Sequence, residues 1–484
     1  MKKHDKRVRK KARTEKDLLG KMEIPSSAYY GIQTLRAVNN FPISGIHNHP
    51  ALIRSYAIVK KAAAGANHRL GLLDRDRFRA ISAACDEVIE GRLADEFPVD
   101  FFQAGAGTST NMNLNEVIAN RALEIAGRKK GEYSYIHPND HVNMGQSTND
   151  TFPTSMHIAL LTQVSGLMRE LRSLEESFAK KARQNAGLLK AARTHLQDGV
   201  PVRWGQVFKS YHTALKKSRK ALEASRPLLE EVAIGGTAGG TGLNTHEDYT
   251  DEVVKLLSRY TRLTLRKSKD LLASMNSHIA VSTFSSGLRN LALELTRIAN
   301  DLRLLSSGPV TGLGELTLPP VQPGSSIMPG KVNPVIAEML NMVCFHTVGV
   351  DSAVSMAVQA GQLELNVMMP LMANELLHAL DALTNALGQF RTKCVDGLTV
   401  DAEKGREYAF SSPSIATVLN RIIGYEKAGE IVKRALREHK TVLTVLREQK
   451  VIPEEILERV FDPFKITGPG MPEREGGKSR RRKG

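Results

Sequence analysis

Three stretches of the chain place apolar residues at spacings of three and four, the pattern of a helix with one buried face. The clearest stretch comprises Phe284, Leu288, Leu291, Leu295, Ile298, Leu302 and Leu305, and the others run over 161–178 and 376–390. Helices of this length form rods, because each residue adds about 1.5 Å along the axis. The sequence therefore predicts an all-α protein with a long central helical bundle, whose apolar seams favour packing between copies of the chain.

The length of the chain and its changes of pattern predict several domains. At 484 residues the chain exceeds what one hydrophobic core usually organises. The periodicity is mixed before residue 145, and after about residue 405 the pattern becomes shorter and more charged. We therefore expect three domains between two basic, disordered tails: tail 1–13, an N-terminal domain 14–147, a bundle domain 148–404, a small helical domain 405–470 and tail 471–484.

The formal charge of +16 would indicate a nucleic-acid-binding protein if it were spread over the whole chain. Residues 1–13 instead hold eight Lys or Arg against one Asp, and residues 478–483 hold five basic residues and no acid. Twelve of the sixteen net charges thus lie in the tails, where runs of charge are usually solvated. We do not expect nucleic acid as a partner of the body of the protein.

Signals for a membrane, for secretion and for a metal are missing from the sequence. Charges interrupt every apolar run before the roughly 18 residues that a membrane span needs, and nothing apolar follows the basic N-terminus as in a signal peptide. The three cysteines, Cys85, Cys344 and Cys394, lie far apart, and no Cys/His cluster has the spacing of metal ligands. We expect reduced thiols in a cytoplasmic protein without a metal site.

Residues 324–334, Gly-Ser-Ser-Ile-Met-Pro-Gly-Lys-Val-Asn-Pro, combine turn-forming residues with groups that bind anions. Gly, Pro and Ser alone make a surface turn, but a turn does not need Lys331 and Asn333. Lys331 offers a point charge for a carboxylate, Asn333 offers an amide, and Ser325 or Ser326 offers a hydroxyl beside flexible glycine. The segment therefore predicts a binding loop for a small dianion rather than an ordinary turn.

Four further polar segments stand out. Residues 105–113 and 146–150 are dense in hydroxyl and amide side chains, and the second precedes a long predicted helix, so it would also serve as a helix N-cap. In 193–198 the imidazole of His195 lies between a hydroxyl and an acid, which favours a functional over a structural histidine. The glycine-rich segment 235–242 is equally consistent with a turn and with the wall of a pocket.

Together these segments supply neutral hydrogen-bonding groups and one lysine, without metal ligands or a nucleotide-binding motif. Such groups suit a small carboxylic acid as substrate. Elimination next to a carboxylate needs a base for a carbon-bound proton, donors for the developing aci-carboxylate, and a group that assists the leaving group. These side chains could fill all three roles.

From Glu15 to about Pro469 the chain resembles the fumarase/aspartase superfamily. The superfamily signature, Gly-Ser-Ser-x-Met-Pro-x-Lys-x-Asn, occupies 324–333, and residues 105–108, 146–150 and 193–198 match other conserved blocks. The resemblance implies a three-domain fold, a homotetramer with a 20-helix core, and active sites that each combine residues of three subunits. The two basic tails lie outside it.

The resemblance also implies a role for each matched position. Ser325 corresponds to the catalytic base that removes the Cβ proton, on a loop that closes over the substrate, and a serine needs an oxyanion environment for this. Lys331 and Asn333 correspond to binders of the α-carboxylate. The implied shell of the β-carboxylate is Thr108, Ser147, Thr148 and Ser326. The implied region of the leaving group is Asn149, Thr194 and the catalytic His195, which Glu338 supports.

Flanking residues favour one activity within the superfamily, the reversible anti-elimination of ammonia from L-aspartate to give fumarate. Residues 29–34 and 366–368 resemble aspartases, whereas 235–238 resembles fumarases. Two alternatives stay open, namely a class II fumarate hydratase and a catalytically silent member. No obligatory cofactor is implied, and activation by a divalent cation stays open. Three residues differ from those usual in the superfamily, and they put the fine specificity for the substrate in doubt: Ala192, Val207 and Met369.

Overall fold

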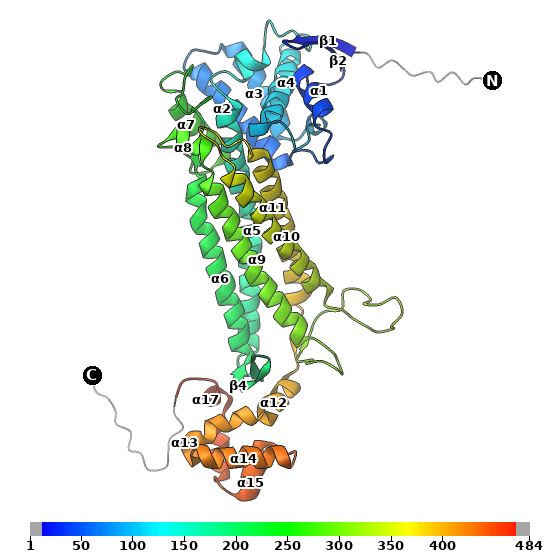
Figure 1. Cartoon of the computed structure of the whole chain (residues 1–484), viewed down its shortest axis with the longest axis vertical. Helices are drawn as coiled ribbons and strands as arrows, with labels where there is room; N and C mark the ends of the chain where they lie inside the picture. The colour runs from blue at the N-terminus through cyan, green and yellow to red at the C-terminus, as the bar shows by residue number, and fades with distance from the viewer. Residues whose placement is uncertain (1–11, 471–484) are drawn as a thin grey trace, which may run out of the picture. The chain divides into compact units, whose positions relative to one another are not determined.

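The computed structural model describes residues 12–470 (Figure 1). Most of the two predicted tails, residues 1–11 and 471–484, lies outside this range. Contacts divide the chain into two compact units. Unit 1 comprises 1–168, 219–293 and 343–384, and unit 2 comprises 169–218, 294–342 and 385–484. The all-α prediction is confirmed, since the strands of the described residues form only two-stranded sheets.

Three of the five helices of 22 to 37 residues contain one predicted apolar seam each, and every residue of those seams is buried. Each of the five contributes one segment to unit 1 and one to unit 2. Burial of a continuous apolar stripe, rather than intrinsic helix propensity, stabilises helices of this kind. The five are α5 (Thr148–Gln184), α6 (Trp204–Leu229), α9 (Ile279–Leu305), α10 (Val335–Gln359) and α11 (Met369–Phe390).

Unit 1 adds shorter elements to its segments of the long helices. Its strands form an antiparallel hairpin, β1 with β2, and a short parallel pair, β5 with β6. The added elements are β1 (Ala12–Asp17), β2 (Gly20–Pro25), α1 (Ile32–Asn40), α2 (Pro50–Arg69), α3 (Arg75–Ile89), α4 (Thr108–Ile125), β5 (Glu231–Val232), α7 (Tyr249–Thr261), β6 (Arg266–Lys267) and α8 (Leu271–Asn276).

The start of β1 corrects the predicted tail 1–13, which is two residues too long. Ala12 and Arg13 pair with β2. The guanidinium of Arg13 donates hydrogen bonds to the carbonyls of Pro25, Ala28 and Tyr30. A basic residue that satisfies three backbone carbonyls is part of the fold rather than of a solvated tail, and composition alone does not distinguish the two cases.

A buried carboxylate, that of Glu116, holds the start of α1 against α4. Its two oxygens accept hydrogen bonds from the backbone N–H groups of Gly31, Gln33 and Thr34 at 2.8–3.1 Å. A Cβ at Gly31 would lie 2.6 Å from Glu15 Oε2 and 2.8 Å from Glu116 Cδ, so only glycine fits there. Burial raises the pKa of Glu116, while these N–H donors oppose the change.

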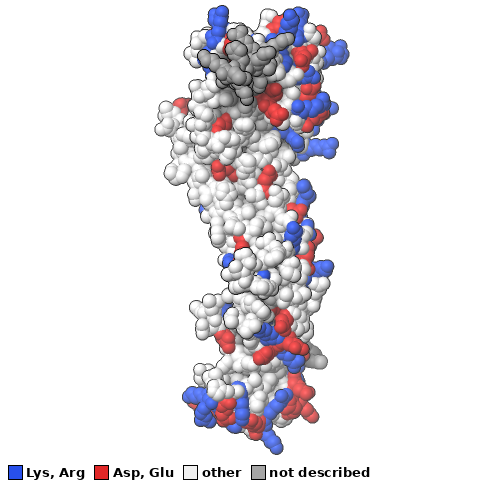
Figure 2. Space-filling view, turned by 90° about the vertical axis from the view of Figure 1, so that its right-hand side faces the viewer, with Lys and Arg blue, Asp and Glu red and all other residues white. Residues whose placement is uncertain are grey.

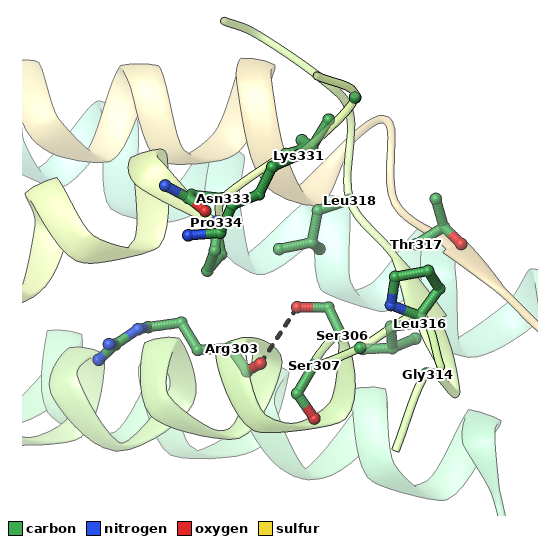
Figure 3. Close-up of a pocket in the computed structure, with 14 residues that line it drawn as sticks. Arg303, Ser306, Ser307, Gly314, Leu316, Thr317, Leu318, Lys331, Asn333 and Pro334 are labelled. Carbon is green, nitrogen blue, oxygen red and sulfur yellow. Dashed lines mark hydrogen bonds between the residues drawn. The ribbon is translucent and has the colours of Figure 1, made fainter. Parts of the chain in front are cut away.

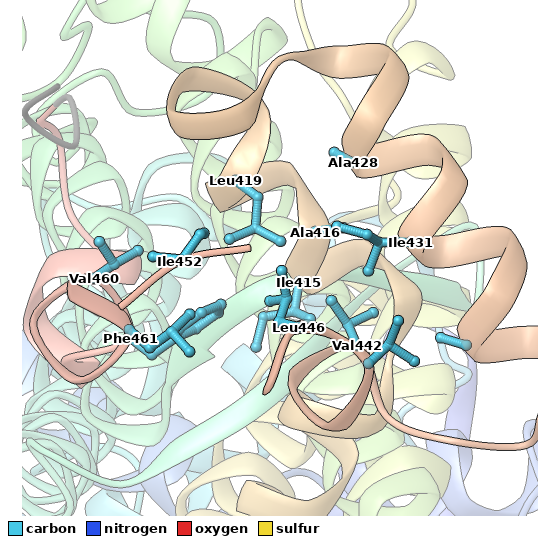
Figure 4. Packing of buried hydrophobic residues seen from close by; sticks show 13 residues of the cluster. Ile415, Ala416, Leu419, Ala428, Ile431, Val442, Leu446, Ile452, Val460 and Phe461 are labelled. Atoms are coloured by element: carbon cyan, nitrogen blue, oxygen red, sulfur yellow. The ribbon is translucent and has the colours of Figure 1, made fainter. Parts of the chain in front are cut away.

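Unit 2 ends in a group of short helices that pack around an apolar cluster including Ile415, Leu419, Ile431 and Leu446 (Figure 4). The helical character predicted for 405–470 is therefore seen, although the predicted boundary at 404 falls inside α12. The three-domain division itself stays a prediction. The elements added in unit 2 are β3 (Leu189–Thr194), β4 (Gln197–Arg203), β7 (Leu316–Thr317), β8 (Thr399–Val400), α12 (Ala402–Ser411), α13 (Asn420–Ile423), α14 (Tyr425–Arg437), α15 (Val442–Gln449), α16 (Glu454–Val460) and α17 (Pro463–Ile466).

Charge on the described surface is mixed. Figure 2 shows acidic and basic side chains interspersed on the visible face, with uncharged areas between them. Interspersed charge does not produce the one-sign field that attracts a polyanion. Among residues 12–470, no helix has the length and apolar character needed to cross a bilayer.

Candidate active site

The N-terminus of α4 positions Thr108 in unit 1. The preceding residues, Ala106 and Gly107, have positive φ angles of 61° and 83°, so the chain turns sharply into the helix. The backbone N–H of Ala106 donates to the carbonyl of Val367 at 2.7 Å. A Cβ at Gly107 would lie 2.2 Å from the Phe152 ring of α5, which explains why glycine stands there. Thr108 is exposed, as a substrate-binding hydroxyl must be.

The N-terminus of α5 positions Ser147, Thr148 and Asn149 in the same unit. Ser147 Oγ accepts from the backbone N–H of Asn149 at 3.2 Å, and Asp150 Oδ1 accepts from the N–H of Ser147 at 2.9 Å. This reciprocal arrangement is a capping box, so the N-cap interpretation holds for Ser147 and Asp150. The side chains of Thr148 and Asn149 take no part in this cap; Thr148 is buried, whereas Asn149 is partly exposed.

The glycine-rich segment lies beside this helix terminus. Asn149 Nδ2 donates to the carbonyl of Ala238 at 2.8 Å. The second oxygen of Asp150, Oδ2, accepts from the N–H groups of Gly235 and Thr237, each at 3.0 Å. Residues 235–242 therefore form more than a linking turn, because they contact one predicted site residue directly and another through a shared carboxylate.

In unit 2, Thr194 and His195 lie at the tip of the β3–β4 hairpin. The two turn residues, His195 and Leu196, have φ angles of 56° and 58°, as a two-residue type I′ turn requires. All three side chains are exposed. The hairpin thus presents the imidazole of His195 to solvent on a short, well-paired support.

A buried ion pair lies two residues before His195 in the chain. Arg193 Nη1 donates to Glu315 Oε2 at 2.5 Å, and Glu315 is fully buried. Glu315 immediately precedes β7, which leads into the signature loop 324–334. The backbone of Glu315 bonds to Leu305 and Asp401. The ion pair therefore connects the hairpin that carries His195 with the root of the loop that carries Ser325.

The signature loop folds back on itself. The N–H of Gly324 donates to the carbonyl of Lys331 at 2.8 Å, and Asn333 Nδ2 donates to the carbonyl of Gly324 at 2.7 Å. A Cβ at Gly324 would lie 2.7 Å from the Lys331 carbonyl oxygen, so the closure needs glycine. Within the closed loop, Ser325 Oγ accepts from the N–H groups of Ile327 at 3.2 Å and Met328 at 3.0 Å.

A cavity of about 530 Å³ adjoins the end of this loop in unit 2 (Figure 3). Lys331 and Asn333 line it together with Arg303 and Ser306 from the end of α9. Arg303 is a second cation that sequence reasoning missed, because one arginine on a long helix gives no signal of its own. The cavity has the size and the polar groups that suit a small carboxylate ligand.

The predicted residues form two groups. Thr108, Ser147, Thr148 and Asn149 belong to unit 1, whereas Thr194, His195, Ser325, Ser326, Lys331, Asn333 and Glu338 belong to unit 2. Glu338 lies in the first turn of α10, and in the described part of this chain no hydrogen bond or ion pair joins it to His195. Support of His195 by Glu338 therefore stays a prediction.

The His, Cys, Asp and Glu side chains of the described residues form no recognisable metal site. In 12–470, no group of three or more His, Cys, Asp or Glu side chains is arranged to hold a metal ion. Cys85, Cys344 and Cys394 are buried and form no disulfide. Burial raises the pKa of the Cys85 and Cys394 thiols to about 12, so neither is a nucleophile near neutral pH.

Comparison with known proteins relates this arrangement to lyases. A family described as Lyase matches residues 20–349, and a second family, Fumarase C C-terminus, matches 415–468. Aspartate ammonia-lyase of Helicobacter pylori is 45% identical over 459 residues, which cover 94% of this chain and 98% of that protein.

Two crystal structures share the fold. Fumarate lyase:delta crystallin from Brucella melitensis, bound to cobalt, has 47% sequence identity and a TM-score of 0.92, covering 95% of this chain and 100% of that one. Recombinant class II fumarase from Schistosoma mansoni has 37% identity and a TM-score of 0.89, covering 94% and 98%.

Proposed function

The chain belongs to the fumarase/aspartase superfamily of lyases, and on that premise we propose that it is a carbon–nitrogen lyase, an aspartate ammonia-lyase. It removes ammonia from L-aspartate to give fumarate, reversibly and without a covalent intermediate. Identities of 45–47% to aspartate ammonia-lyases of Helicobacter pylori and Pseudomonas aeruginosa, over nearly the whole chain, support this activity.

The environment of Ser325 is the observation that carries the proposal. A serine hydroxyl is a weak base, and it removes a carbon-bound proton only where its alkoxide form is stabilised. Two backbone N–H groups, those of Ile327 and Met328, already donate to Ser325 Oγ. Donors aimed at one oxygen stabilise negative charge there, so the loop prepares Ser325 for the role of general base.

The other predicted residues then act on the two carboxylates and the leaving group. Lys331 and Asn333 bind the α-carboxylate, whose negative charge the ammonium of Lys331 complements. When Cβ loses its proton, the aci-carboxylate develops on the β-carboxylate, which therefore needs hydrogen-bond donors. Thr108, Ser147, Thr148 and Ser326 donate to the β-carboxylate. Asn149, Thr194 and His195 surround the amino group, and His195 at the exposed hairpin tip assists the departure of ammonia. Proton removal and loss of the amine occur on opposite faces of the C–C bond.

We further propose that the protein works as a homotetramer whose active sites combine residues of three subunits. In the part of α10 that lies in unit 1, the exposed positions include Phe345 and Met356, which are 59% and 63% exposed. The charged residue of that segment, Asp351, is buried and bonded to Ser285. The exposed positions of this segment carry no Lys, Arg, Asp or Glu and include these two large apolar side chains, which favours contact with another copy of the chain.

The cellular location and the cofactor requirement of the enzyme are part of the same proposal. Buried cysteines that form no disulfide suit the cytoplasm, which we propose as its location. The chemistry assigned to the chain uses only its own side chains, so we expect no obligatory cofactor. Activity measured with EDTA, and again with added Mg²⁺, tests whether a divalent cation activates the enzyme.

The second candidate is a class II fumarase, which the likeness to the Schistosoma mansoni enzyme favours. The two activities give the same product, and they differ in substrate. Formation of fumarate, followed by its ultraviolet absorbance, should be seen with L-aspartate and not with L-malate. Activity with malate alone would assign the chain to the fumarases, and inactivity with both would favour a silent superfamily member.

A further inference from the structure

The carboxylate of Asp150 joins two segments that are far apart in the chain. It is fully buried. Its Oδ1 atom accepts from the N–H of Ser147 at the start of α5, and its Oδ2 atom accepts from the N–H groups of Gly235 and Thr237. An ordinary capping box needs only the first of these bonds. The second oxygen therefore serves the glycine-rich segment.

The segment 235–242 is tightly folded around that oxygen. Gly235 has a φ of 95°, and a Cβ there would lie 2.0 Å from Thr250 Oγ1. Thr237, which is not a glycine, has a φ of 54° and so lies in a strained left-handed conformation. Such a conformation persists only where surrounding contacts enforce it, and Asp150 accepts a hydrogen bond from the N–H of this very residue.

The same segment supports a predicted substrate-binding residue. Asn149 Nδ2 donates to the carbonyl of Ala238 at 2.8 Å, one residue after Thr237. Displacement of the segment would therefore turn the Asn149 amide. Because Ser147 is bonded to the other oxygen of Asp150, one carboxylate sets the orientation of both ends of the Ser147–Asn149 turn.

A buried lysine is linked to the same turn through Asn143. Lys60 on α2 is fully buried, and its Nζ donates to Asn143 Oδ1 at 2.8 Å. The Asn143 side chain in turn donates to the carbonyl of Gln146, directly before Ser147. Burial lowers the pKa of Lys60 to about 7 and raises that of Asp150 to about 7, while the charge of each opposes the change in the other.

We infer that Asp150 is a positioning residue of the active site, and that Lys60, linked through Asn143 to the residue before Ser147, supports the same turn. This inference rests on the proposed function for its link to substrate binding. Apolar side chains would fill the same space without the cost of burying two charges. They would not hold three N–H groups, and the Ser147–Asn149 turn and the segment 235–242 would then move independently.

Hydrogen exchange of the backbone amides in 235–242, measured by mass spectrometry, tests the inference without relying on turnover. In Asp150→Asn the amides of Gly235 and Thr237 face an amide group in place of a carboxylate, so we expect their exchange to accelerate tenfold or more. We expect the KM for L-aspartate to rise by a similar factor, with a smaller change in kcat. Lys60→Met should show the same pattern, and the double variant should recover part of the protection because it buries no unpaired charge.

The matched control is Glu116→Gln, which alters another buried carboxylate that accepts backbone N–H bonds in the same unit. It should lower the thermal midpoint but leave exchange in 235–242 at the wild-type rate. Wild-type exchange and KM in a folded Asp150→Asn protein would overturn the inference. If that variant does not fold, the same two readings on Lys60→Met decide the question. A wild-type protein that is inactive on aspartate would refute the proposed function. The exchange rates in 235–242 would still show whether Asp150 holds this segment in place.

Discussion

Replacement of Glu315 by glutamine should destabilise unit 2, because the Glu315 carboxylate is the buried partner of Arg193. The Glu315 side chain is 0% exposed and that of Arg193 is 16% exposed. Among the described residues, Glu315 Oε1 has no hydrogen-bond partner, so the ion pair with Arg193 is the main compensation for burying the charge. Glutamine has the same shape and keeps one acceptor, but it leaves the guanidinium without its counterion.

The size of the effect follows from these contacts. Removal of one partner of a buried ion pair costs about 3–5 kcal/mol, because the other charge stays buried and uncompensated. The retained amide oxygen and the partial exposure of Arg193 reduce that cost, so we expect about 2–3 kcal/mol for Glu315→Gln. The double variant Arg193→Met/Glu315→Gln should be less destabilised than the sum of the single variants, because it leaves no unpaired charge.

Urea unfolding followed by Trp204 fluorescence measures this prediction directly. Trp204 is the only tryptophan of the chain, it is fully buried, and it belongs to unit 2. All variants must be compared at one protein concentration, since an oligomer gains stability by mass action. The control is Glu454→Gln, which breaks an exposed pair with Arg447 in the same unit and should leave the midpoint unchanged. An equal midpoint for Glu315→Gln and this control would refute the reasoning.

Four further predictions concern the active site and the core. Ser325→Ala should lower kcat by orders of magnitude with assembly intact, and near-normal turnover would remove Ser325 as the base. Lys331→Ala should mainly raise the KM for aspartate, since it removes the charge that binds a carboxylate, and an unchanged KM would contradict this role. Gly107→Ala should lower the thermal midpoint and weaken substrate binding, because the new Cβ would lie 2.2 Å from the Phe152 ring at a φ of 83°; a wild-type melting curve would show that this contact relaxes freely. Burial lowers the pKa of His278 from 6.5 to about 3. Between pH 6.5 and about pH 3, the imidazole of His278 therefore binds a proton in the unfolded chain but not in the folded protein. The free energy of unfolding is highest above pH 6.5 and is lower by about 2 kcal/mol at pH 5. His278→Met should remove this loss, and an unchanged difference between urea midpoints at pH 8 and pH 5 would exclude His278 as its cause.

The sequence by itself determined the features that depend on neighbouring residues. The period of the apolar seams predicted the long helices, because side chains three and four residues apart share one helical face. The same local logic predicted a dianion-binding loop at 324–334, where lysine and asparagine exceed what a turn requires. It also indicated a helix N-cap within 146–150, which Ser147 provides. The basic tails stay a prediction, except that Ala12 and Arg13 belong to β1.

The tertiary structure decided what the polar residues contact. Asp150 and Gly235 are 85 residues apart in the chain, and Arg193 and Glu315 are 122 apart. No periodicity relates such pairs, because they meet only after the long helices have packed and brought their ends together. The structure likewise distinguished a supporting segment from an ordinary turn at 235–242. Burial also raises the pKa of Asp150 and lowers that of Lys60, which residue identity alone does not specify.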